Sequence, residues 1–99
     1  MRLVDFINDY GIEAFEAFVD LYGDEEEAIE VIDSDGFIVF DDCHDMADVA
    51  AQIVNETYDI NNMGALANYI DYEGFGRDLE IESTFIKHPV EDTYFEIIY

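Results

Sequence analysis

The protein is a chain of 99 residues with 26 Asp and Glu side chains and three Lys and Arg, which gives a formal net charge of −23 at pH 7. Hydrophobic residues make up 51 % of the chain, including seven Tyr and eight Phe, so the composition excludes a disordered protein and supports a folded core. This length allows one compact domain or two very small units that share a core. Three cations cannot neutralise a phosphate track, which excludes nucleic acid as a direct ligand and favours a basic protein partner.

The net charge approaches the charge density of duplex DNA. A duplex carries one charge per about 1.7 Å of axis, so −23 corresponds to about 39 Å of duplex. A globule of this length is expected to be roughly 30–35 Å across. Because self-repulsion destabilises the compact state, a function for the charge is expected. Halophilic adaptation is the alternative explanation, although the aromatic-rich composition argues against it.

The first third of the chain predicts a small cluster of helices. Apolar residues at helical spacing predict helices over Leu3–Tyr10 and Ile12–Tyr22, with Gly11 and Gly23 as breaks. Asp24 is the expected N-cap of a third helix, whose first turn carries Glu25, Glu26 and Glu27 where the helix dipole favours anions. Residues 1–35 are therefore predicted to form an acidic helical segment.

The remainder, residues 36–99, predicts an α+β unit. A turn over residues 33–36 leads to a strand at 37–40, a helix at 45–57 and a polar link at 58–62. A helical region begins at residue 63, and two strands, Thr84–Lys87 and residues 94–99, form a hairpin around a loop that contains Pro89. The expected fold is a helical cluster followed by a short three-stranded antiparallel sheet packed against helices.

Residues 69–82 read YIDYEGFGRDLEIE and predict a helix with Asp71 as its N-cap. Gly74 and Gly76 each lower helix propensity by roughly 1 kcal/mol, so packing must hold this helix. Arg77 is surrounded in the sequence by acidic residues and is expected to form an intramolecular ion pair. The residues expected on its buried face are Tyr69, Ile70, Tyr72, Phe75 and Leu79.

Three stretches resemble the ArdA antirestriction proteins: NYIDYEGFGRDLEIESTFI, FIVFDDCHDMADVAAQIVNET before it, and the closing FEIIY. The resemblance extends from about Gly36 to Tyr99. Members of that family are commonly longer, so the chain resembles their central and C-terminal parts. The resemblance implies an acidic, elongated dimer that imitates bent B-form DNA and blocks Type I restriction–modification enzymes of the host. It also implies a structural motif of Tyr69, Asp71, Tyr72, Arg77 and Asp78.

The candidate functional residues are carboxylates expected on the outer faces of helices and at the end of the first strand. Residues three or four apart on a helix lie about 4.5–6 Å apart along its axis, so outward carboxylates can stand where a DNA-binding groove expects phosphates. The predicted DNA-mimicking surface comprises Asp5, Asp9, Glu13, Glu16, Asp20, Asp24, Glu25, Glu26, Glu27, Glu30, Asp33, Asp41, Asp42, Asp45, Asp48 and Glu56.

Other functions find less support in the sequence. Cys43, His44 and His88 lack the spacing of a structural zinc site, and no phosphate-binding loop or nucleophile motif predicts an enzyme or a cofactor. A single cysteine and the lack of a signal or membrane segment favour the cytoplasm. The small residues Ala47, Ala50 and Val54 are the predicted dimer contact. A DNA mimic against another defence enzyme, such as a CRISPR effector, and an acidic interaction module without mimicry remain as alternatives.

Overall fold

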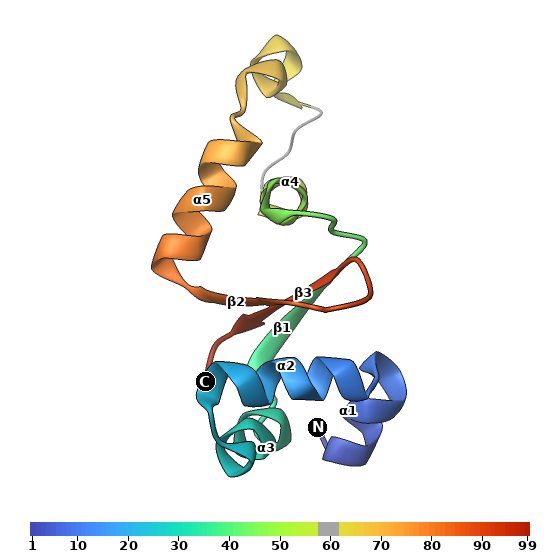
Figure 1. Cartoon of the computed structure of the whole chain (residues 1–99). Coiled ribbons are helices and arrows are strands. Elements are labelled where there is room, and N and C mark those ends of the chain that lie inside the picture. The colour runs from blue at the N-terminus through green and yellow to red at the C-terminus, as the bar shows by residue number, and fades with distance from the viewer. Residues whose placement is uncertain (58–61) are drawn as a thin grey trace.

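The computed structural model describes residues 1–57 and 62–99 (Figure 1). The helices and strands, in chain order, are α1 (Leu3–Tyr10), α2 (Ile12–Tyr22), α3 (Glu25–Asp33), β1 (Phe37–Asp41), α4 (Met46–Thr57), the 3-10 helix η2 (Gly64–Tyr69), α5 (Tyr72–Glu82), β2 (Thr84–Lys87) and β3 (Thr93–Ile97).

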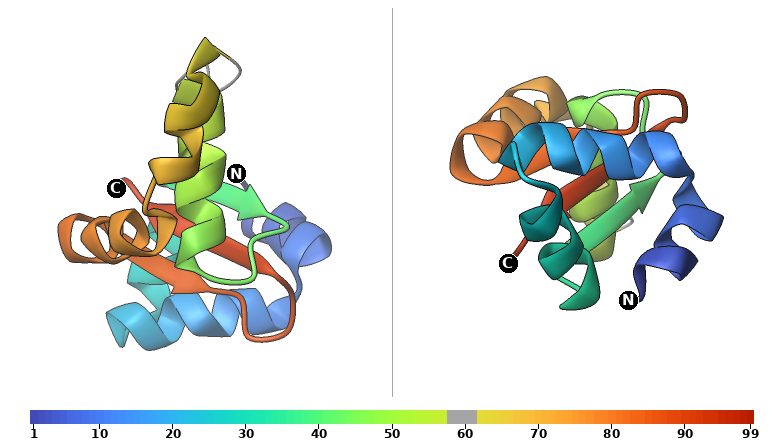
Figure 2. Two further views of the ribbon diagram at one scale, coloured as in Figure 1. Left: turned by 90° about the horizontal axis from the view of Figure 1, so that it is seen from above. Right: turned by 60° about the horizontal axis from the view of Figure 1, so that its bottom comes forward.

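The sheet is the middle of three layers. Its strands have the order β1-β3-β2, and both pairs are antiparallel, with β3 in the centre. Figures 1 and 2 show α1, α2 and α3 on one face of the sheet and α4 and α5 on the other. The predicted α+β class and three-stranded antiparallel sheet are confirmed.

The layer of α1–α3 is joined to the sheet by four phenylalanines: Phe6 of α1, Phe18 of α2, Phe37 of β1 and Phe95 of β3. Each ring contacts the other three, with centroids 5.2–6.0 Å apart. Phe6, Phe18 and Phe95 are fully buried. Aromatic pairs at such distances contribute about 0.5–1.5 kcal/mol each beyond area burial. The predicted segments 1–35 and 36–99 therefore share this core.

The opposite face of the sheet carries a second core, in which Phe40, Cys43, Met46, Val49 and Tyr94 are buried. Close packing of α5 on α4 completes this layer. At the contact, Gly76 is the buried residue of α5, and a Cβ built on it would lie 2.7 Å from the backbone oxygen of Met46. Glycine at position 76 therefore has a packing role, since any side chain there would push α5 away from α4.

The helix predicted over residues 69–82 is interrupted. Helix η2 ends at Tyr69, Ile70 is extended, and α5 begins at Tyr72. Asp71 is confirmed as the N-cap, because its Oδ1 accepts a 2.9 Å hydrogen bond from the backbone N–H of Gly74. An N-cap residue has non-helical backbone angles, so the same interaction that starts α5 separates it from η2. As a result Tyr69 is 83 % exposed, and its predicted place on the buried face is wrong.

The molecule is longer than a globule of its size. Its Cα radius of gyration is 15.0 Å and its principal extents are 48 × 24 × 23 Å. The expected diameter of roughly 30–35 Å was too short. Figure 1 shows the reason, because α4, η2 and α5 extend from the sheet on the side opposite α1–α3.

The loop between β2 and β3 is held to α1 by His88, which is 3 % exposed. Its Nε2 lies 2.6 Å from the backbone oxygen of Tyr10, and its Nδ1 accepts hydrogen bonds from the backbone N–H groups of Val90 and Glu91. The imidazole is therefore neutral and protonated on Nε2. One side chain thus satisfies a carbonyl at the end of α1 and two amides of the loop.

The substitution His88→Ala should lower the free energy of unfolding by about 2 kcal/mol, because it leaves these three backbone groups without their partner. Urea unfolding followed by circular dichroism measures the change. The matched control is His44→Ala, whose side chain is 77 % exposed, and it should change stability by less than about 0.5 kcal/mol. Equal effects of the two substitutions would contradict this role of His88.

The substitution Gly76→Ala should destabilise the protein by about 1–3 kcal/mol, because the new methyl group would overlap the backbone of Met46. The direction of the change tests the contact, because alanine at an exposed helical position would instead stabilise the protein by roughly 1 kcal/mol relative to glycine. Thermal or urea unfolding measures it. A stabilised Gly76→Ala variant would show that α4 and α5 are not in such close contact.

Candidate functional site

All sixteen carboxylates of the predicted DNA-mimicking surface are exposed. The helical layer α1–α3 contributes the larger share, and the rest lie at the end of β1, in the turn after it and on α4. None of them neutralises a cation inside the described parts of the chain, where the amino group of Met1 pairs with Asp35 and the rings of His44 and His88 lie near Asp92 and Glu91.

Five of these carboxylates form what we call the acidic track: Asp9, Asp41, Asp42, Asp48 and Glu56. It runs from the end of α1 past the end of β1 and along α4. Tyr10 lies between the first two of these residues. Burial raises the pKa of its phenol, and the charges of Asp41 and Asp9 raise that pKa further. Carboxylates from two layers of the fold thus act on the same phenol.

The track continues through the residues around Cys43. Burial raises the pKa of the Cys43 thiol, and the charges of Asp48, Asp42, Asp41 and Asp45 raise it further. The thiol is 1 % exposed and lies 3.2 Å from the side-chain oxygen of Gln52 on α4. Cys43 therefore lies beneath the part of the acidic track formed by Asp41, Asp42 and Asp48.

Two hollows open beside the track. One is lined by Asp41, Asp42, Asp48 and Glu56 together with neighbouring residues of α4. The other joins Asp41 and Asp42 to Glu91 and Asp92 of the β2–β3 loop. The sequence prediction missed Glu91 and Asp92. The antiparallel pairing of Asp41 with Thr93 places them there, and the prediction did not determine that register.

Hydrogen bonds to backbone amides fix Asp48 of the track and its neighbour Asp45 at the start of α4. Asp45 Oδ1 accepts from the N–H of Asp48 at 3.0 Å, and Asp48 Oδ2 accepts from the N–H of His44 at 2.8 Å. Carboxylates at a helix N-terminus satisfy free amides and are favoured by the helix dipole. These two side chains are therefore held in place, which gives this end of the track a defined geometry.

The acidic residues of α2 and α3 form a second exposed region. Asp24 is confirmed as the cap of α3, with Oδ1 accepting from the N–H of Glu26 at 3.0 Å. Burial and then the charge of Glu27 raise the pKa of Tyr22. A hydrogen bond to Glu30 is the main cause of the raised pKa of Tyr99. The protonated phenols thus lie beside carboxylates of α3.

A comparison with protein families gives a match over residues 1–96 to the family described as antirestriction protein (ArdA). The chain belongs to the ArdA antirestriction family. The match includes the first 35 residues, so it is wider than the resemblance that begins near Gly36. No curated protein sequence matches the chain. Members of the ArdA family are inhibitors.

The ArdA motif residues have different surroundings from those predicted. Asp71 caps α5 and Tyr72 is half-buried, whereas Tyr69 and Asp78 are exposed. Arg77 is also exposed, and the expected intramolecular ion pair is not found among the residues described in the structure.

The predicted dimer contact through α4 does not agree with the exposure of its residues. Ala50 is 0 % and Val54 5 % exposed within a single chain, and Ala47 is half-buried. These small side chains lie in the layer where α5 packs closely on α4. Their size serves that internal contact.

The three residues considered for a zinc site each have a different partner. Cys43 contacts Gln52, the His44 ring lies 3.3 Å from Asp92, and His88 holds the loop to α1. In the part of the chain that the structure describes, no three His, Cys, Asp or Glu side chains are placed to hold a metal ion. No helix within residues 1–57 and 62–99 is long and apolar enough to cross a bilayer.

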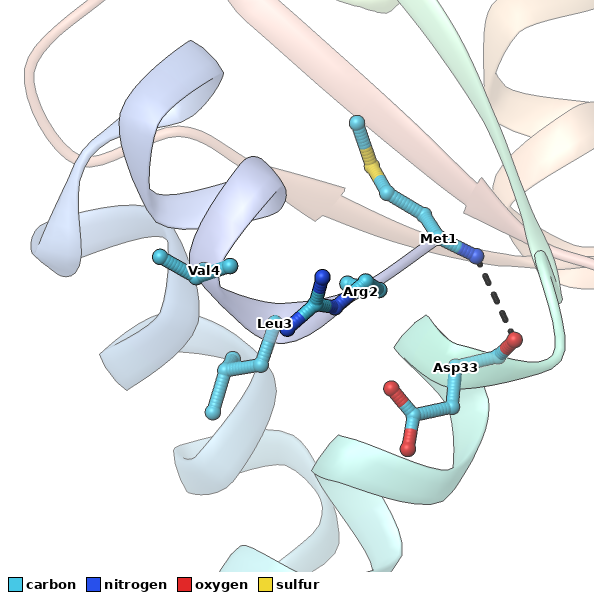
Figure 3. A pocket seen from close by; sticks show the side chains of 5 residues that line it. All are labelled: Met1, Arg2, Leu3, Val4 and Asp33. Atoms are coloured by element: carbon cyan, nitrogen blue, oxygen red, sulfur yellow. Dashed lines mark hydrogen bonds between the residues drawn. The ribbon is translucent and has the colours of Figure 1, made fainter.

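A further hollow adjoins the N-terminus and is lined by Met1, Arg2, Leu3, Val4 and Asp33 (Figure 3). The amino group of Met1 donates a 3.2 Å hydrogen bond to the backbone oxygen of Asp33. In Figure 3 the guanidinium of Arg2 is directed toward Leu3, away from the Asp33 carboxylate. This hydrogen bond holds the start of the chain against the end of α3.

The acidic track can be tested through Cys43. Its raised pKa means that the folded thiol ionises only above the ordinary value of 9.0. The unfolded thiol ionises first, so the contribution of Cys43 to stability is present below pH 9 and is lost as the pH rises through the folded pKa. The Cβ chemical shift of Cys43, followed by NMR from pH 7 to 11, should give a midpoint above 9.

Asp42→Asn should lower that midpoint, because it removes one of the charges that oppose ionisation. Asp42 has a positive φ of 57°, a conformation that asparagine adopts readily, so the fold should be retained. Asp20→Asn on α2 is the control and should leave the midpoint unchanged. A midpoint at or below 9 in the parent protein would contradict the placement of Cys43 beneath the track.

Proposed function

We propose that this ArdA-family protein is a DNA mimic that occupies the DNA-binding channel of a Type I restriction–modification enzyme, with surface carboxylates in place of phosphates. It would act in the cytoplasm of the host, as a homodimer, and without a cofactor. The single observation that carries the proposal is the exposed acidic surface on a rigid, elongated fold. Membership of the antirestriction family supports the choice of target.

The dimensions and the charge agree with this proposal. The molecule is 48 Å long and carries 26 carboxylate side chains. A duplex of that length carries about 28 phosphate charges. The net charge of −23 remains close to this value because the chain has three cationic side chains. A basic channel would therefore meet a similar number of negative charges over a similar length.

The arrangement of the charges also supports mimicry. The acidic track crosses from α1 to α4, and hydrogen bonds at the start of α4 hold Asp45 and Asp48 in position. Fixed charges cost less ordering entropy on binding than charges on mobile side chains. The aromatic core supplies the rigidity, since α1, α2 and two strands meet in one set of contacting rings.

Binding should be driven largely by the release of counterions from both surfaces. The affinity for a Type I enzyme should therefore fall steeply as the salt concentration rises. A sharper test compares two triple variants with the same change in charge. The first, Asp9→Asn/Asp42→Asn/Glu56→Gln, removes three charges of the acidic track. The second, Glu73→Gln/Asp78→Asn/Glu80→Gln, removes three exposed charges of α5, where Arg77 also lies.

The track variant should bind a purified Type I enzyme at least about tenfold more weakly, with a salt dependence reduced by about two to three counterions. The α5 variant should lose less than about threefold in affinity. Inhibition of DNA cleavage by the enzyme should follow the same order. Equal losses for the two variants would show that total acidity alone matters, and no loss for either would refute the mimic.

A further inference from the structure

Strand β1 lies at one edge of the sheet and is paired with β3 on one side only (Figure 2). In an antiparallel pair, residues whose backbone groups bond to the neighbour alternate with residues whose groups point away from it. The N–H of Ile98 donates a 2.9 Å hydrogen bond to the carbonyl of Gly36. In the register of β1 with β3, the residues whose N–H and C=O groups point outward are therefore Phe37 and Val39. Within residues 1–57 and 62–99, these outward groups have no hydrogen-bond partner.

The sequence of β1 does little to protect this edge. Natural edge strands are commonly kept from further pairing by lysine, proline or a bulge. The other edge strand, β2, follows this rule, because it ends at the exposed Lys87 and Pro89 comes soon after. Strand β1 instead begins with four apolar residues, Phe37–Phe40, and its charged residue is the last one, Asp41. The outer edge of β1 is thus suited to accept an additional strand.

Exposed apolar side chains lie next to this edge. Side chains alternate between the two faces of a strand, so Ile38 shares the α4–α5 face of the sheet with Phe40. Ile38 is 43 % exposed. Its partner on β3 is Glu96, and Ile98, two residues further along, is 58 % exposed. A strand added beside β1 would bring its own side chains into contact with Ile38.

We infer that the outer edge of β1 binds an extended segment of a partner protein, which joins the sheet as a fourth strand. Hydrogen bonds between main chains, at Phe37 and Val39, supply the pairing, and an apolar side chain of the segment lies beside Ile38. This mode of binding depends on backbone groups at one edge of the sheet. It is therefore independent of the proposed function, which depends on carboxylates in place of phosphates.

Charge selects a basic segment and sets its direction. At the end of β1, Asp41 and Asp42 share a hollow with Glu91 and Asp92. At the start of β1, the N-terminal amino group pairs with Asp35, which offsets that charge. Lysine or arginine residues of the segment are therefore attracted to the end of β1. Antiparallel pairing is slightly more stable than parallel pairing, so the basic residues come before the apolar ones in the segment.

A second copy of this chain fits this edge poorly. In an antiparallel contact of two β1 strands centred on Val39, Asp42 of each copy would lie close to Asp35 of the other. Like charges across paired strands destabilise the pairing. Each copy also carries a net charge of −23, and the two copies repel one another.

Amide hydrogen exchange tests the edge with a defined probe, an eight-residue peptide of arginine and lysine followed by alternating valine and threonine. In the free protein the N–H groups of Ile38 and Phe40 should exchange slowly, because they face β3, and that of Val39 should exchange fast. Saturating peptide should slow exchange at Val39 at least about tenfold and leave Ile38 and Phe40 unchanged. Unchanged exchange at Val39 would overturn the inference, as would no saturable binding up to about 1 mM peptide.

Two control peptides separate strand pairing from attraction to an acidic surface. The first has proline at two adjacent central positions, which removes a donor facing β1 and keeps the charge. It should bind at least about tenfold more weakly, and equal affinity would overturn the inference. The second has the reversed sequence and should bind at least about threefold more weakly. Equal or tighter binding of the reversed peptide would overturn the antiparallel direction.

Variants of the protein test the same contact from the other side. Val39→Pro removes an N–H that points outward and leaves the bonds to β3 in place, so peptide affinity should fall at least about tenfold. Circular dichroism verifies its fold.

Asp41→Asn/Asp42→Asn retains the backbone donors and should weaken binding at least about threefold. The matched control, Glu16→Gln/Asp20→Asn on α2, removes two exposed charges far from the edge in sequence and should change affinity by less than about twofold. Equal losses for these two double variants would show binding through total charge and overturn the assignment of β1.

Discussion

The contact among Phe6, Phe18, Phe37 and Phe95 is the interaction on which the rest of the fold depends. These rings come from α1, α2, β1 and β3, so they join the first helical layer to both the edge and the centre of the sheet. The carboxylates outside this core repel one another at every separation short of the screening length. The core must outweigh that repulsion for the charges to keep a fixed arrangement.

The three-layer architecture gives the two ends of the molecule different properties. The sheet holds α1–α3 on one face and the α4–α5 pair on the other, and the second pair extends the molecule to 48 Å. Close packing at Gly76 holds α5 against the start of α4, and the Asp71 cap starts α5 as a helix separate from η2. Exposed carboxylates therefore lie on both outer layers of the molecule.

Much of this fold follows from local patterns in the sequence. Helical periodicity predicted α1, α2 and α3, and the cap residues Asp24 and Asp71 were correct because a cap depends on neighbours within one turn. Exposure of the acidic residues was also predictable, since an unpaired carboxylate is costly to bury.

The features that were not predicted depend on contacts between distant segments. Gly76 looked like a weakness of a helix, and its role becomes clear only when Met46 lies against it. His88 bridges to a residue 78 positions earlier, which no spacing rule detects. Arg77 was expected to pair because acids flank it in sequence, yet the helix places it outward without a partner among the described residues. The small residues of α4 suggested an interface between chains, but they serve an interface within one.

The most direct measurement of the central claim is competition between this protein and duplex DNA for a Type I restriction–modification enzyme. A fluorescently labelled copy of the protein is titrated with the enzyme at fixed salt and increasing concentrations of unlabelled duplex. If the carboxylates occupy the DNA channel, the apparent dissociation constant rises in proportion to the duplex concentration, and no ternary complex forms. An apparent dissociation constant that stays the same at saturating duplex would place the protein outside the channel and contradict the account.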